Sequence, residues 1–186
     1  MVLYNMIRHN NPQAFAQKVE DISEQLGINP DWFMLGMYFE SGLNPKAVNR
    51  TSGATGLIQF MPTTARNMGT STEALALMDG IAQLDHVYQY LAPYKNRMSS
   101  FVDVYLSVFY PSAVGKSSDY ILGGAGTAIS RKIAEQNRIF DTNHDGQISK
   151  AEVTAYIEKW ANKVLGSNQF GRKALTFAPL LLGFFL

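Results

Sequence analysis

Residues 32–42 read Trp-Phe-Met-Leu-Gly-Met-Tyr-Phe-Glu-Ser-Gly, an apolar run that ends in a carboxylate. Residues 32–39 are apolar on every face, which predicts a short helix that is buried all round. Glu40 then comes where this helix should end, and glutamate is seldom buried without a partner. Desolvation there would favour the neutral acid and raise its pKa, as general acid catalysis requires. The structural alternative is a helix-end glutamate that turns to water or pairs with a basic residue.

The segment that follows, residues 41–62, has the composition of a loop that wraps closely around a ligand. It contains three glycines, an Asn-Pro pair and a Thr-Ser-Gly cluster, all of which favour turns and close backbone approach. If its second half is extended, Gln59 and Met61 lie on the same side of the chain. A carboxylic acid, an amide and a thioether that face one cleft would suit a sugar with an N-acetyl group.

These residues resemble the soluble lytic transglycosylase family. The resemblance lies in Glu-Ser-Gly-Leu-Asn-Pro-x-Ala-Val from Glu40 and in Gly-Ala-Thr-Gly-Leu-Ile-Gln-Phe-Met-Pro-Thr-Thr-Ala from Gly53. It is dense over residues 40–65 and looser over residues 12–125. It implies a mainly α, goose-type-lysozyme-like fold and cleavage of the β-1,4 bond between N-acetylmuramic acid and N-acetylglucosamine in peptidoglycan.

The resemblance also implies a mechanism that uses a single glutamic acid and no metal or other cofactor. Glu40 would protonate the glycosidic oxygen and then, as a base, take the proton of the C6 hydroxyl that attacks internally, leaving a 1,6-anhydromuramic end. Gln59, Met61 and Tyr110 would hold the N-acetyl group and its neighbouring hydroxyls. Two alternatives stay open: a muramidase that hydrolyses the same bond, and a non-catalytic peptidoglycan-binding module.

The sequence departs from the family pattern at two places. Residues 109–113 read Phe-Tyr-Pro-Ser-Ala where the family has an Ala-Tyr-Asn-Ala-Gly-like motif, so Tyr110 matches the family tyrosine and a proline replaces the asparagine. Tyr105, on the same predicted helix, is expected to be a core aromatic with a bonded hydroxyl. Many members carry a serine where this chain has Asn49, so Asn49 or Ser52 is expected to contact the N-acetyl group.

A hydrolase would need a second carboxylate at a defined distance from the acid. The motif around Glu40 supplies one carboxylate alone. Asp85 and Asp103 lie on neighbouring predicted helices, where they are expected to be surface or capping residues.

Composition limits the remaining function classes. The 186 residues carry a formal net charge of +1, so no global basic field attracts nucleic acid. The absence of cysteine excludes disulfides and cysteine nucleophiles. The first ten residues lack the pattern of a signal peptide. The family resemblance implies action in the periplasm or cell wall. Without a signal peptide, delivery by a phage or as part of a virion is one route that fits. We expect a monomer.

The rest of the chain is predicted to be mainly helical. Asn11 and Asn29 each precede a proline, a pattern typical of helix starts, and Thr70 with Glu73 forms a capping-box pattern. Residues 123–126, Gly-Gly-Ala-Gly, are interpreted as a flexible joint, and no convincing strand pattern is present. The predicted helices cover residues 12–26, 30–40, 62–68, 74–78, 79–92, 101–110, 129–140 and 151–165.

A second motif occupies residues 141–152, Asp-Thr-Asn-His-Asp-Gly-Gln-Ile-Ser-Lys-Ala-Glu. Oxygen-bearing side chains fall at positions one, three and five, glycine at six and glutamate at twelve, which is the pattern of an EF-hand calcium loop. A single loop without a second hand predicts a structural Ca²⁺ clamp on the C-terminal helices, and disfavours a calcium sensor. The expected ligands are Asp141, Asn143, Asp145, the carbonyl of Gln147, Ser149 directly or through water, and Glu152.

These motifs divide the chain into a catalytic domain over residues 1–125, an EF-hand over residues 126–166 and an apolar tail over residues 167–186. The tail is too short to span a bilayer as a helix. Two readings of it stay open: it packs on the domain, or it contacts a membrane surface or a virion assembly.

Overall fold

The computed structural model describes residues 1 and 3–166, so the predicted apolar tail lies outside the described residues. The structure confirms a mainly helical fold. Its α-helices are α1 (Pro12–Leu26), α2 (Pro30–Ser41), α3 (Pro62–Asn67), α4 (Thr72–Leu77), α5 (Gly80–Leu91), α6 (Phe101–Phe109), α7 (Ala128–Gln136) and α8 (Lys150–Gly166). Short 3₁₀ turns η1 (Tyr4–Met6), η2 (Ala92–Tyr94) and η3 (Pro111–Ala113) and strands β1 (Ile121–Gly123) and β2 (Ile148–Ser149) complete the described elements.

Helix ends follow the local chemistry of the sequence. The side chain of Asn11 accepts a hydrogen bond from the backbone N–H of Ala14, and α1 ends at the left-handed Gly27. Asn29 caps α2 in the same way. The predicted capping box at Thr70 is wrong by one residue, because Ser71 is the residue that caps α4.

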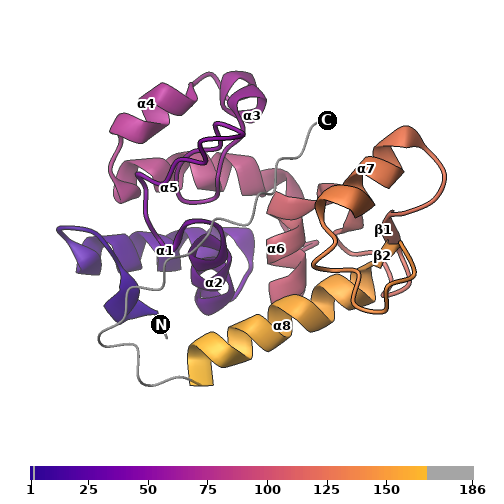
Figure 1. Cartoon of the computed structure of the whole chain (residues 1–186). Coiled ribbons are helices and arrows are strands. Elements are labelled where there is room, and N and C mark those ends of the chain that lie inside the picture. Colours follow the sequence, from indigo (N-terminus) through magenta and orange to yellow (C-terminus); the bar gives the residue numbers. More distant parts are fainter. Residues whose placement is uncertain (2, 167–186) are drawn as a thin grey trace.

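Helix α2 lies at the centre of the fold, in contact with α1 on one side and α6 on the other. Residues 33–39 are all buried, as the uniformly apolar run predicts. A β-carbon on Gly36 would lie 3.7 Å from a methyl of Val104 on α6, which is an ordinary van der Waals distance. Figure 1 shows α3 and α4 above α5, and α7 with β1 and β2 on the far side of α6 from α1.

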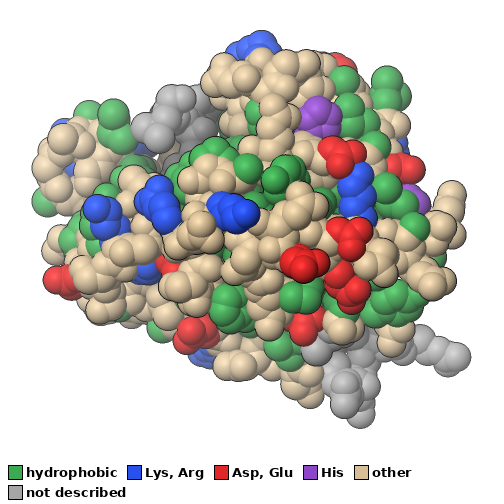
Figure 2. Space-filling model, turned by 180° about the vertical axis from the view of Figure 1, so that it is seen from behind, with side chains coloured by type: hydrophobic (Ala, Val, Ile, Leu, Met, Phe, Trp, Pro, Cys, Tyr) green, Lys and Arg blue, Asp and Glu red, His purple; other side chains and the backbone are tan. Residues whose placement is uncertain are grey.

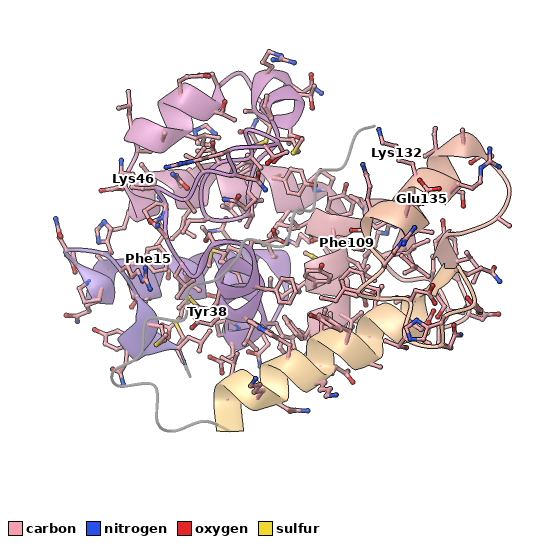
Figure 3. All side chains as sticks on the ribbon, viewed as in Figure 1. Phe15, Tyr38, Lys46, Phe109, Lys132 and Glu135 are labelled. Atoms are coloured by element: carbon pink, nitrogen blue, oxygen red, sulfur yellow. The ribbon has the colours of Figure 1, made fainter. Side chains whose placement is uncertain are left out.

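The C-terminal helices share the core of the N-terminal ones. Helix α8 contacts α6, and an aromatic cluster fills the space between them, with the ring of Phe109 5.3 Å from Tyr105 and 5.1 Å from Phe140. Figure 3 places Phe109 on α6, on the side of the helix that faces α7 and α8. The two parts of the chain are therefore packed against each other through one hydrophobic cluster.

The described strands are too short for the alternation that reveals a strand in sequence. They pair antiparallel, with Ile121 opposite Ser149 and Gly123 opposite Ile148. The glycine-rich stretch interpreted as a flexible joint is packed here: a β-carbon on Gly123 would lie 2.7 Å from a methyl of Ile133. Gly123 is therefore part of the folded structure.

The surface shows both signs of charge, as the net charge near zero predicts. Lys and Arg side chains and Asp and Glu side chains both occur on the face seen in Figure 2. Within residues 1 and 3–166, no helix has the length and apolar character needed to cross a membrane.

Candidate active site

Glu40 is held at the end of α2, beside the loop that follows it. The helix ends because Gly42 adopts a left-handed conformation, with φ 63°. The hydroxyl of Ser41 donates to the carbonyls of Met37, at 3.0 Å, and of Leu57, at 2.9 Å. Ser41 thereby ties the end of the helix to the loop that carries Gln59 and Met61.

Gln83, a fully buried side chain of α5, holds the loop between α2 and α3 in place through hydrogen bonds to its backbone. Its Oε1 accepts from the backbone N–H of Leu57 at 2.9 Å. Its Nε2 donates to the carbonyls of Pro45 and Leu75, at 2.6 and 2.8 Å. Sequence reasoning missed Gln83, because only its polar character on the apolar side of an amphipathic helix singles it out.

The extended backbone that would place Gln59 and Met61 on one side of the chain is interrupted at Gln59. Residues 56–59 form a turn, and Gln59 has a φ of +54°, a conformation uncommon for residues other than glycine. The Nε2 of Gln59 donates to the carbonyl of Gly56 at 3.0 Å and to that of Ala47 at 3.3 Å. The turn still brings Gln59 and Met61 to the same cavity as Glu40.

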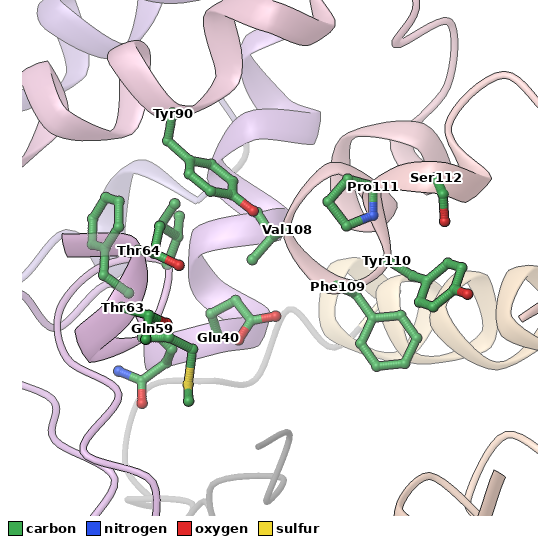
Figure 4. Close-up of a pocket in the computed structure, with 13 residues that line it drawn as sticks. Glu40, Gln59, Thr63, Thr64, Tyr90, Val108, Phe109, Tyr110, Pro111 and Ser112 are labelled. Carbon is green, nitrogen blue, oxygen red and sulfur yellow. The ribbon is translucent and has the colours of Figure 1, made fainter. Parts of the chain in front are cut away.

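This cavity has a volume of about 420 Å³, within the range of ligand-binding pockets. In Figure 4 the carboxyl of Glu40 points between the loop with Gln59 on one side and the end of α6 with Tyr110 on the other. The structure therefore brings together four of the predicted site residues: Glu40, Gln59, Met61 and Tyr110. The lining residues are Glu40, Ile58, Gln59, Phe60, Met61, Thr63, Thr64, Tyr90, Val108, Phe109, Tyr110, Pro111 and Ser112.

Asn49 and Ser52 are not among the residues that line the cavity. Asn49 is buried, and its side-chain oxygen accepts from the backbone N–H groups of Thr51 and Ser52, at 2.9 and 3.1 Å. The hydroxyl of Ser52 accepts from the N–H of Ala54 at 3.3 Å. In this structure both side chains stabilise the turn before Gly53, and neither faces the cavity.

The environment of Glu40 stabilises its protonated form. Burial raises the pKa of Glu40 from its ordinary 4.5 to about 8. No residue in the described part of the chain forms a salt bridge with Glu40, so no opposing charge offsets this desolvation. At neutral pH the group is therefore mostly a carboxylic acid.

Glu40 is the only carboxylate among the described residues that line the cavity. Asp85 pairs with Lys18 at 2.7 Å on the surface between α1 and α5. Asp103 is buried in the first turn of α6, where it bonds Lys150 at 2.9 Å. Neither is placed to act on a substrate bound beside Glu40.

Tyr90, on α5, is a cavity residue that sequence reasoning missed. Its hydroxyl donates to the carbonyl of Ser107 at 3.2 Å. That carbonyl lies four residues before Pro111, which has no N–H to offer it. Burial, followed by the nearby Tyr94 and Glu40, raises the pKa of Tyr90, so its hydroxyl stays a donor and secures the end of α6.

Tyr105 is a core aromatic, as predicted, and lies 1% exposed. Its ring meets Phe39 edge-on at 4.9 Å. The expectation that its hydroxyl is bonded is not met, since that oxygen has no hydrogen-bond partner in the described part of the chain.

Residues 141–152 form a tight loop closed by its own carboxylates. The two oxygens of Asp141 accept from the N–H groups of Asp145 and Gly146, each at 3.1 Å, and Gly146 makes the turn with a φ of +77°. The carboxylate of Glu152 accepts from the N–H of Ser149 at 2.9 Å and from that of Thr142 at 3.1 Å. Glu152, at position twelve of the loop, thus bonds back to Thr142 at position two.

The donor set of this loop is all oxygen, which suits Ca²⁺. Within residues 1 and 3–166, no three His, Cys, Asp or Glu side chains gather as a metal-binding group. The expected set includes three carboxylates, Asp141, Asp145 and Glu152, and here each of them accepts from backbone N–H groups of the loop. The fit to Ca²⁺ therefore rests on the chemistry and order of the donors.

Residues 17–103 match the family model described as the Transglycosylase SLT domain. The comparisons with curated proteins and with solved structures find no match. The matched residues include Glu40, the loop with Gln59 and Met61, and Tyr90; Tyr110 and the 141–152 loop lie beyond them. The match supports the lytic transglycosylase family of peptidoglycan-cleaving enzymes, and with it the peptidoglycan of the cell wall as the substrate.

Proposed function

We propose that this protein is a lytic transglycosylase that cleaves the N-acetylmuramic acid–β-1,4–N-acetylglucosamine bond, with Glu40 as its single acid and base. The observation that carries the proposal is a single carboxyl, Glu40, in a cavity without a second described carboxylate; burial supports its acid role by raising its pKa to about 8. A hydrolase of the two-carboxylate type would need a partner that this cavity does not offer.

In the proposed reaction Glu40 first gives its proton to the glycosidic oxygen, and the bond from that oxygen to C1 of the muramic sugar breaks. The substrate's own N-acetyl group stabilises the positive charge at C1. Glu40, now ionised, takes the proton of the C6 hydroxyl as that oxygen bonds to C1. No water is consumed, and Glu40 ends the cycle protonated.

The remaining cavity residues would hold the sugar. Gln59 has committed its amide nitrogen to backbone carbonyls, which leaves its side-chain oxygen to accept from an N-acetyl N–H. Met61 supplies apolar contact for the acetyl methyl. Tyr110 and the hydroxyls of Thr63 and Thr64 line the cavity and can bond sugar hydroxyls.

The products decide between the proposed reaction and its alternatives. We expect mass spectrometry of soluble fragments from purified peptidoglycan to show products lighter by one water than hydrolysed muropeptides. Reducing-end products would indicate a muramidase. A protein that binds peptidoglycan and releases nothing would be a binding module.

The rate should fall at alkaline pH. The folded pKa of Glu40 is raised from 4.5 to about 8, so the acid form required for the first step persists through neutrality and is lost as the pH rises through about 8. We expect the release rate to decline with a single ionisation near that pH, measured from about pH 5 to about pH 10, with circular dichroism at each pH to verify folding. A decline that begins near pH 5 would contradict this environment for Glu40.

We also propose that residues 141–152 bind a structural Ca²⁺ through Asp141, Asn143, Asp145, Gln147, Ser149 and Glu152. Binding to the folded state alone stabilises it by about 2.7 kcal/mol when free Ca²⁺ is a hundredfold above Kd. For a chain of this size we expect EDTA to lower the Tm by about 5–10 °C, measured by calorimetry.

The control for chelation is Asp141→Asn, which removes the charge of the first ligand and keeps the side chain's shape. We expect the Tm of this variant to respond little to EDTA or to added Ca²⁺. Equal responses of the variant and the unmodified protein, or no Ca²⁺ by metal analysis, would exclude the site.

A further inference from the structure

A buried lysine joins the C-terminal helix-loop-helix to the wall of the cavity. Lys150, the first residue of α8, is 8% exposed, and lysine is seldom buried unless paired. Its Nζ donates to Asp103 Oδ1 at 2.9 Å, to the carbonyl of Lys116 at 2.8 Å and to that of Ala113 at 3.2 Å. An ammonium has three N–H groups and no acceptor, so these contacts match its donors one for one.

Asp103 completes the contact from α6. The oxygen that accepts from Lys150 also accepts from the N–H of Gly115 at 3.2 Å, and the other oxygen accepts from the hydroxyl of Ser99 at 3.0 Å. Burial alone would raise the pKa of Asp103, but the hydrogen bonds from Lys150, Gly115 and Ser99 hold it below its ordinary value. The ionised pair thus holds residues 113–116 by their backbone: Lys150 binds the carbonyls of Ala113 and Lys116, and Asp103 binds the N–H of Gly115.

These contacts continue directly into the cavity. The N–H of Ala113 donates to the carbonyl of Tyr110 at 2.9 Å, and the N–H of Val114 donates to that of Pro111 at 3.2 Å. Tyr110 and Pro111 line the cavity together with Ser112. Ala113, whose carbonyl Lys150 binds, is therefore adjacent in sequence to the last of these lining residues.

We propose that Lys150 is a positioning residue for this cavity: it holds residues 110–116 so that Tyr110 and its neighbours form the wall opposite the loop with Gln59. The proposal rests on the proposed function only for its kinetic readout. On this view the helix-loop-helix is a structural part of the substrate-binding cleft, and Lys150 adds a polar connection to the aromatic packing of Phe109 against Phe140.

The proposal predicts a split between binding and turnover. Glu40 lies on α2 and is fixed by the end of that helix, and no described contact of Lys150 involves it. Loss of Lys150 should therefore displace the wall that binds the sugar and leave the acid in place. A residue with a merely structural role would lower stability without changing KM.

The test compares Lys150→Met with Lys18→Met, which also breaks an ion pair, at 2.7 Å, but on the surface. We expect Lys150→Met to raise KM for soluble glycan strands about tenfold, which corresponds to about 1.4 kcal/mol, with a smaller change in kcat. Hydrogen exchange, which needs no substrate, should show faster exchange at the amides of residues 113–116. Lys18→Met should change neither quantity.

Unchanged KM and unchanged exchange at residues 113–116 in Lys150→Met would overturn the proposal. If Lys150→Met does not fold, Lys150→Arg serves as the test variant. Arginine keeps the positive charge, but its planar guanidinium cannot bond one carboxylate and two carbonyls in the same arrangement. KM and the exchange rate at residues 113–116 should therefore still rise. Wild-type values in Lys150→Arg would then overturn it. If the wild-type protein releases no fragments, the proposed function fails. The hydrogen-exchange rates at residues 113–116 then still test whether Lys150 holds this segment.

Discussion

Glu40→Gln is expected to abolish release of soluble peptidoglycan fragments while making the protein more stable. Glutamine keeps the size of the side chain but can neither give nor take the proton that the proposed reaction moves twice. General acid–base catalysis contributes roughly 10² to 10⁴-fold to a rate. Because one residue serves both steps, we expect a loss toward the upper end of that range, measured as fragments released per unit time.

The gain in stability follows from the sign of the pKa shift. The folded pKa of Glu40 is raised from 4.5 to about 8, so near neutrality the unfolded chain gives up a proton that the folded chain retains. This lowers the free energy of unfolding as pH rises above 4.5, and the loss is complete above about 8. At about 1.4 kcal/mol per pKa unit, reduced for the part of Glu40 that water reaches, the cost is on the order of 3 kcal/mol.

We therefore expect the Tm of Glu40→Gln to exceed that of the wild-type protein, by more near pH 8 than near pH 5. The matched control is Glu20→Gln, which makes the same chemical change on an exposed face of α1 and should alter neither activity nor the pH dependence of Tm. An active Glu40→Gln would show that another group is the acid. An inactive variant with lower Tm at every pH would show that Glu40 is ionised and stabilising in the fold.

The predicted site residues that the structure places at one cavity are those that a local sequence pattern singles out. Glu40 stands out because it ends an apolar run, and α2 begins and ends where Asn29 and Gly42 place its caps. Gln59 and Met61 line the cavity with Gln59 in a turn, and not in the extended conformation that would also place them on one side. Both side chains line the cavity because the loop as a whole faces Glu40.

The residues that sequence reasoning missed act across the fold. Gln83 and Tyr90 are ordinary helical residues in sequence, and their roles come from carbonyls 8 to 38 residues away. Asn49 was expected at the sugar because it can hydrogen-bond, but its oxygen is used by two backbone N–H groups of its own turn. Local hydrogen bonds of this kind compete with any role in binding, and composition does not reveal which use prevails.

Gly56→Ala is expected to destabilise the protein strongly and to disturb the cavity with it. Gly56 has a φ of +87°, and a β-carbon there would lie 2.5 Å from Oε1 of Gln83. Gln83 cannot yield without losing its bonds to Leu57, Pro45 and Leu75. The left-handed backbone costs a non-glycine residue about 1–2 kcal/mol, and overpacking adds about 1–3 kcal/mol.

The comparison that isolates the steric part is Gly69→Ala. Gly69 has a similar φ of +76°, but a β-carbon there would meet nothing within 4 Å, so only the backbone cost of about 1–2 kcal/mol should appear in urea unfolding. We expect Gly56→Ala to exceed Gly69→Ala by about 2 kcal/mol and to lose activity, since the displaced loop carries Gln59 and Met61. Gln83→Ala should cost less stability in the Gly56→Ala background than in the wild-type protein. In that background, removal of the Gln83 side chain also relieves its clash with the new β-carbon at position 56. Equal losses in the two glycine variants would mean that Gln83 does not hold this loop in place.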